Sequence, residues 1–207
     1  MIAVTLNVRE LAIQRAQQWL EGISPLTREA KALRSLGLLC CSRILSGRGL
    51  RGRGGSARFR LPTTRDFVTG ERAKTLAVCR SISLASARAR SMDPKRQAVW
   101  SETFGGVALS YARAGDPSTT AALLRASAQL GLEHPWLMEA ERFLLAQQTP
   151  EGCFGLFARE LQMVRSEEPP WMPYLNFSVE VLWALAEVTA LHAGHEQGNG
   201  DRAEGSA

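Results

Sequence analysis

Apolar residues recur every three or four positions along most of the chain, a spacing typical of helices that bury one face. Runs of alternating Val, Ile and Thr, which are typical of strands, are absent, and the helix formers Ala, Leu, Arg, Glu and Gln recur throughout. The pattern predicts an all-α fold. Helices are expected over residues 8–21, 27–45, 70–92, 94–114, 117–131, 135–148, 156–164 and 175–192.

Polar residues followed by proline mark where several of these helices begin. Asp93 and Asp116 each stand directly before a proline, which joins an acidic N-cap to the residue preferred at the first helical position. His134 precedes Pro135 in the same way, and Thr27 can cap the second helix. The links between these helices are short, which favours antiparallel neighbours. We therefore expect six or seven of these helices to form one antiparallel array.

Residues 140–155, AERFLLAQQTPEGCFG, predict the end of a helix followed by a tight, ordered turn. Pro150 cannot continue the helix, and Gly152 can adopt the left-handed conformation that the turn needs. Gln148 can satisfy backbone groups in the turn, while Phe154 brings an aromatic ring back toward the helix end. We expect Gln148 and Phe154 to brace the turn that lies between them.

This stretch resembles the QW repeat of the terpene cyclase and protein prenyltransferase superfamily. The matching residues are Ala140, Phe143, Leu144, Gln148, Gly152 and Phe154. In that superfamily, helical hairpins stack into α/α toroids, and the Gln and the aromatic residue brace one helix against the next turn. The repeat usually has Trp at the position of Phe154. The resemblance implies an incomplete α/α toroid-like array of antiparallel hairpins, and the chain is also similar to helical proteins of actinobacteria.

The catalytic residues of that superfamily are missing from this chain. Its class II cyclases carry an Asp-x-Asp-Asp acid, and its prenyltransferases hold zinc with Asp, Cys and His. The aspartates here are isolated: Asp66, Asp93, Asp116 and Asp201. A P-loop, a Gly-x-Ser-x-Gly motif and a His-Glu-x-x-His motif are also missing. We therefore favour a binding role over catalysis, and we expect neither a cofactor nor a metal.

The cysteines and the apolar segments bear on the compartment. The cysteines are Cys40, Cys41, Cys79 and Cys153. Their spacing matches no metal site, so buried free thiols in a reducing compartment are expected. The first residues lack the basic leader of a signal peptide, and we expect no membrane span. The sequence thus predicts a cytoplasmic protein, with one helical domain over 1–193 and a disordered tail over 194–207.

Basic residues are concentrated in the middle of the chain. Between Arg28 and Arg96 there are 17 Lys and Arg against 4 Asp and Glu, whereas from Gln97 onward there are 6 against 14. The Gly/Arg-rich segment 46–63 is interpreted as a flexible, solvated loop. The alternative is a site for anions or nucleic acid. That site would use Arg48, Arg51, Arg53, Arg58 and Arg60.

Aromatic residues gather in the second half of the chain. If inner helices surround a central cavity, aromatic walls would suit a hydrophobic small molecule. The candidate pocket residues are Trp100, Phe104, Tyr111, Trp171, Tyr174 and Trp183. A plain hydrophobic core explains the same residues, and we prefer it. On α-helical spacing, Trp100, Phe104, Val107 and Tyr111 form one stripe.

Three functional hypotheses follow. The first is a small-molecule-binding or accessory protein, which the superfamily resemblance connects to secondary metabolism. The second is a protein-interaction scaffold or homodimer, in which stacked hairpins present a surface to a partner or to a second copy. The third is a nucleic-acid binder that uses the basic region 28–96, and we regard it as the weakest of the three.

Overall fold

The structure, a computed structural model, describes residues 2–47, 93–155 and 171–203. Within these residues it contains six helices and no strand, apart from an isolated bridge between Gln148 and Phe154. The helices are α1 (Ile2–Gly22), α2 (Arg28–Leu45), α4 (Pro94–Arg113), α5 (Pro117–Leu130), α6 (Pro135–Ala146) and α8 (Met172–Ala203). The all-α prediction is therefore confirmed.

The expected N-caps are present at four helix starts. The Thr27 side chain accepts a hydrogen bond from the Ala30 amide (3.1 Å), and Asp116 accepts one from the Thr119 amide (3.0 Å). Asp93 caps α4 in the same way. At the start of α6, Nδ1 of His134 accepts a hydrogen bond from the Trp136 amide. These caps satisfy amides that have no partner inside their helices, which explains why the predicted starts of α2, α4, α5 and α6 were accurate.

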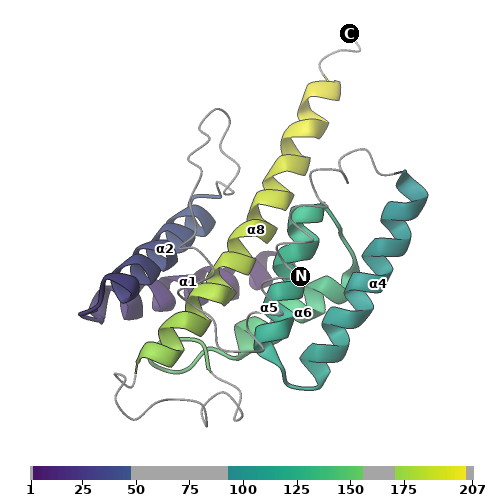
Figure 1. The fold of residues 1–207 in the computed structure, drawn as a ribbon. Helices are drawn as coiled ribbons and strands as arrows, with labels where there is room; N and C mark the ends of the chain where they lie inside the picture. Colours follow the sequence, from purple (N-terminus) through teal and green to yellow (C-terminus); the bar gives the residue numbers. More distant parts are fainter. Residues whose placement is uncertain (1, 48–92, 156–170, 204–207) are drawn as a thin grey trace.

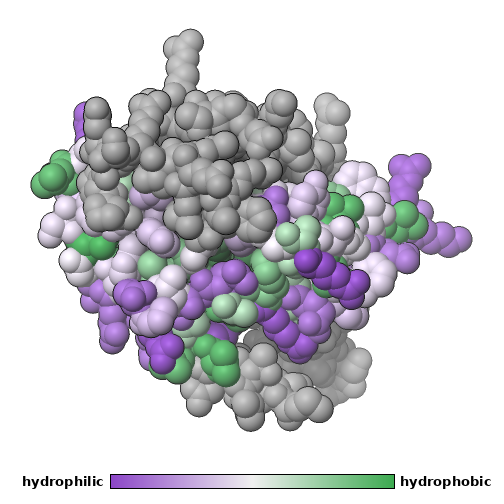
Figure 2. Space-filling model, turned by 90° about the horizontal axis from the view of Figure 1, so that it is seen from below, coloured by the Kyte–Doolittle hydropathy of each residue, from purple (hydrophilic) through white to green (hydrophobic). Residues whose placement is uncertain are grey.

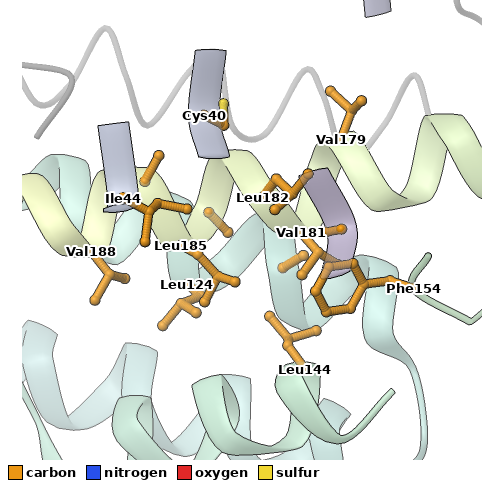
Figure 3. Close-up of a cluster of buried hydrophobic side chains, with 14 of the residues drawn as sticks. Cys40, Ile44, Leu124, Leu144, Phe154, Val179, Val181, Leu182, Leu185 and Val188 are labelled. Carbon is orange, nitrogen blue, oxygen red and sulfur yellow. The ribbon is translucent and has the colours of Figure 1, made fainter. Parts of the chain in front are cut away.

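Helix α8 is the centre of the fold. It packs against α2 on one side and α5 on the other, and Figure 1 shows it crossing the molecule between α2 and the group formed by α4, α5 and α6. Its buried side chains include Leu182 and Leu185, which meet Cys40 of α2 and Leu124 of α5 in one hydrophobic cluster. Figure 3 shows this cluster around the α8 axis. Core burial of this kind supplies most of the driving force for folding.

Helix α8 differs from its prediction in length. Its segment Met172–His192 is long and apolar enough to cross a membrane by length and composition, contrary to our estimate from the sequence. In the most apolar window, 61% of the residues are buried inside the molecule, where they form the core. The helix also continues through Ala203, although we had placed its end at 192 and disorder over 194–207. Extending an existing helix needs no new nucleus, so a packed helix can propagate into a weak sequence.

One predicted helix start is wrong, and several predictions concern residues outside the described part of the chain. Helix α1 begins at Ile2, six positions earlier than predicted. The helices expected over 70–92 and 156–164, and the Gly/Arg-rich loop at 46–63 beyond Gly47, lie outside the described residues. The toroid-like arrangement of the hairpins stays a prediction.

Candidate interaction surface

The turn at 148–154 joins three parts of the core. Nε2 of Gln148 donates hydrogen bonds to the carbonyl oxygens of Ala12 (2.6 Å) and Gly152 (2.9 Å). The Phe154 ring is fully buried, and its amide donates to Oγ of Ser178 at 2.9 Å. Figure 3 shows this ring beside side chains of α8 and α6. Gln148 and Phe154 thus brace the turn as the sequence predicted, and they tie it to α1 and α8.

Gly152 is needed for this arrangement. Its φ of +99° lies in the left-handed region, and a Cβ at this position would collide with the main-chain carbonyl of Arg15 in α1. Phe143, another residue of the motif, is half-buried against the core. All of these side chains face inward. The motif is therefore an architectural element, and the candidate functional surface must lie elsewhere.

Helix α4 presents its small residues to the core. Its buried positions are Ser101, Gly105, Ala108 and Ala112. Our preference for Trp100 and Tyr111 as core residues is therefore wrong. The large apolar residues of α4 are instead exposed: Val99 is 61% exposed, Trp100 38%, Val107 40% and Tyr111 41%. We call these four residues the α4 face.

One member of the predicted stripe does contact the core. Phe104 is half-buried against the core cluster, and its ring stacks on Trp100 with centroids 5.9 Å apart and planes 17° apart. Stacking of this kind holds the exposed Trp100 ring in one orientation, because aromatic pairs prefer defined geometries. The α4 face therefore includes an ordered aromatic side chain.

The close approach of α6 forms one edge of the α4 face. A Cβ on Gly105 would lie 3.0 Å from Nδ1 of His134, and one on Gly106 would lie 3.4 Å from Cζ3 of Trp136. The two glycines therefore admit the His134 and Trp136 side chains. The Trp136 ring is held edge-on by His134, with centroids 4.6 Å apart, yet it stays 39% exposed.

An open hollow lies where α4 and α6 meet. It has a volume of about 280 Å³ and is lined by Gly106, Leu109, Ser110, Arg113 and Trp136. The lining combines an apolar floor with one hydroxyl and one guanidinium group. None of the six residues predicted to line a ligand pocket borders this hollow. Its open shape suits a protruding side chain of another protein better than an enclosed small molecule.

Two opposite charges lie along one edge of the α4 face, on the side of the hollow. Glu102 and Arg113 are both exposed, and neither takes part in an ion pair or side-chain hydrogen bond within the described part of the chain. They stand three helical turns apart, about 16 Å along the axis. Seen from below Figure 1, the described surface also mixes hydrophobic with hydrophilic residues (Figure 2). Charged groups rim the exposed apolar residues of α4.

The other half of the predicted pocket lies on α8 and at Trp171 just before it. Trp183 is half-buried. Its Nε1 donates to Oε1 of Glu187 at 3.1 Å, and the Arg125 guanidinium lies 4.3 Å from its ring centroid. Trp171 and Tyr174 are also half-buried. Helix α5 packs against both α4 and α8 and stands between them, as Figure 1 shows. The six aromatic residues thus form two separate groups.

The described residues also bear on the predictions for the cysteines, for a metal and for the anion site. Cys40, Cys41 and Cys153 are buried free thiols as predicted, and burial raises the pKa of Cys40 and of Cys41 to about 12. Groups of His, Cys, Asp and Glu that could hold a metal are absent from the residues that the structure describes. The predicted anion-site residues lie outside these residues. They are Arg48, Arg51, Arg53, Arg58 and Arg60.

Sequence reasoning missed the contacts of Arg9. One guanidinium nitrogen lies 3.2 Å from Oε1 of Glu141 on α6, and another donates to the Leu185 carbonyl (2.9 Å) and the Thr189 hydroxyl (2.7 Å) on α8. The Arg9 and Glu141 side chains are only 16% and 14% exposed. No local pattern in the sequence could have paired residues so far apart.

Searches of family models, of curated proteins and of solved structures each found no match.

Proposed function

We propose that this protein is a protein-interaction module that binds a helix of another polypeptide through the α4 face and the adjoining hollow. The observation that carries this proposal is the inverted pattern of α4. Small residues of that helix fill the core, while Trp100, Val107 and Tyr111 face outward. Large apolar side chains that are exposed to solvent lower solubility and do not stabilise the core. A partner that covers them explains their exposure.

The composition of the surface fits a protein partner. Trp, Tyr and Arg are the residues that dominate binding energy at protein interfaces, and Trp100, Tyr111, Trp136 and Arg113 lie on or beside this face. The Trp100 and Trp136 rings are each ordered by a neighbouring ring, so little entropy is lost when they are covered. A straight row of apolar residues on one helix is also the shape that a partner helix can follow.

A small-molecule pocket is less well supported. The six aromatic side chains suggested for it lie on α4, on α8 and at Trp171 just before α8, on either side of α5. Trp183 is engaged in another way, since it donates a hydrogen bond to Glu187 and lies under the Arg125 guanidinium. The interaction scaffold, one of the alternatives raised by the sequence, is therefore the function that we favour.

Site-specific photo-crosslinking tests this proposal in cells that produce the protein. A benzoylphenylalanine at Thr103, which is exposed in the middle of the α4 face, should give defined protein adducts. The same group at Ala32, exposed on α2, is the matched control and should give none. Adducts of equal yield at both positions, or the absence of adducts at Thr103, would contradict the proposal.

A further inference from the structure

One side of α4 points directly away from the core. Six residues follow one another there at intervals of three and four positions, the spacing along which two helices remain in contact. We call them the outer row: Arg96, Val99, Thr103, Gly106, Ser110 and Arg113. At about 100° per residue this row lies opposite the buried Ser101 and Ala108, and its members other than Gly106 are exposed. The outer row is therefore the line that a partner helix can follow.

The middle of the outer row lets a partner approach closely. Its middle residues are small: Thr103, Gly106 and Ser110. Small side chains at a helix contact shorten the distance between the two helix axes. Trp100 and Val107 stand beside the row on one flank, and the hollow lies on the other. A partner helix on the outer row therefore also covers exposed apolar side chains of the α4 face.

Both ends of the outer row are positively charged. Helix α4 carries three cations and one carboxylate, all of them exposed: Lys95, Arg96, Arg113 and Glu102. Among the described residues, none of these cations has a partner in an ion pair or a side-chain hydrogen bond. Lys95 and Arg96 also lie in the first turn, where the helix macrodipole favours carboxylates. These charges therefore do not stabilise α4 itself, and they are complementary to a negatively charged partner.

Arg113 can hold a carboxylate in the hollow. A guanidinium group binds a carboxylate through two parallel hydrogen bonds. The hollow places Arg113 among the apolar side chains of Leu109 and Trp136, where water screens an ion pair less than on an open surface. Arg96 lies 17 positions earlier, roughly 25 Å along the helix axis. The two arginines thus define the distance at which a partner can place two acidic side chains.

We propose that the polypeptide bound by the α4 face presents an acidic amphipathic helix, which lies along the outer row and pairs carboxylates with Arg96 at one end and Arg113 at the other. This inference rests on the proposed function and names the chemistry of the partner. Apolar residues of the partner helix lie between these carboxylates and cover Trp100 and Val107. A basic helix is disfavoured, because it would meet like charges at both ends of the row.

Photo-crosslinking in different charge backgrounds tests this inference. Benzoylphenylalanine at Thr103 lies in the middle of the outer row and reports on the bound segment in cells that produce the protein. R96E/R113E reverses the charge at both ends of the row, and R96K/R113K keeps it. The matched control R28E/K31E reverses two exposed charges on α2, so the net charge changes by the same amount as in R96E/R113E. Circular dichroism of each purified variant checks that the fold is intact.

We expect adducts at Thr103 in the otherwise unchanged protein, in R28E/K31E and in R96K/R113K. The yield should be at least tenfold lower in R96E/R113E, because like charges then meet at both ends of the row. Mass spectrometry of the crosslinked peptide should show more Asp and Glu than Lys and Arg. Undiminished adducts in R96E/R113E, or a crosslinked peptide that is basic or belongs to a second copy of this chain, would overturn the inference and leave the proposed function standing. The absence of adducts in every background would contradict the proposed function itself.

Discussion

Gln148 donates its side-chain amide to the carbonyl of Ala12, 136 positions earlier in the chain, over a distance of 2.6 Å. The same nitrogen donates to the Gly152 carbonyl within its own turn. One side chain therefore closes the 148–154 turn and fastens it to α1. The amide satisfies main-chain groups that would otherwise be buried without partners, which is the kind of contact whose loss is costly.

Removal of this amide should destabilise the protein. Replacement of Gln148 with Ala leaves the Ala12 and Gly152 carbonyls without their donor, and we expect a loss of about 1–3 kcal/mol in the free energy of unfolding. Urea denaturation measures it. Gln147→Ala is the matched control, because the Gln147 side chain makes only a 3.4 Å contact with the Phe143 carbonyl. An equal loss for both variants would contradict the bracing role.

Gly152 and Gly131 allow two effects of a side chain to be separated. Both glycines have positive φ, but a Cβ would collide with Arg15 only at Gly152, and it would meet nothing within 4 Å at Gly131. Gly131→Ala should therefore cost about 1–2 kcal/mol of backbone strain alone. Gly152→Ala should cost more, because α1 must also move. Thermal melts of the two variants compare these costs, and equal melting temperatures would show that the contact with α1 is unimportant.

The Arg9–Glu141 pair should matter more than the Glu139–Arg142 pair. Glu141→Gln leaves the largely buried Arg9 charge without its carboxylate, which should cost about 2–4 kcal/mol. Glu139→Gln should cost less than about 1 kcal/mol, because Glu139 and Arg142 are each more than half exposed. Chemical denaturation of the two variants provides the comparison. Similar losses from both substitutions would contradict a special role for Arg9.

The buried thiols of Cys40 and Cys41 should be unreactive in the folded protein. Because burial raises their pKa from 9.0 to about 12, thiolate is scarce at neutral pH, and thiolate is the reactive form. Their contribution to stability is complete below pH 9 and is lost as the pH rises toward 12. Iodoacetamide labelling followed by peptide mass spectrometry should modify them at pH 8 only after unfolding. Rapid labelling of the native protein would contradict this burial.

The sequence predicted the starts of most helices because local chemistry determines them. Asp93, Asp116, His134 and Thr27 cap their helices through contacts only two or three residues away. The roles of Gly152 and Gln148 in the turn were also predicted from local spacing. Periodicity could not show which side of α4 faces the core, because a stripe of small residues and a stripe of aromatic residues both have helical spacing. The helices that pack against α4 determine which of the two stripes is buried.

For the same reason, local sequence patterns could not predict the contacts between distant segments. The partners of Arg9 are supplied by α6 and α8, and the Ala12 carbonyl that receives Gln148 has no signature of its own. The sequence therefore predicted which residues form the candidate surface, as a stripe containing Trp100, Val107 and Tyr111, but not that they are exposed. Its outward orientation became evident only once α5 and α6 were seen to occupy the opposite side of α4.

Native mass spectrometry of the full-length protein, before and after denaturation, tests the central claim most directly. For the wild type purified from the cells that produce it, we predict a complex with a second polypeptide chain and no small molecule. For Val107→Asp, which places a charge at the centre of the α4 face, we predict a folded protein without that chain. A wild type that carries no second chain would contradict the account, most clearly if it carried a small molecule that denaturation released.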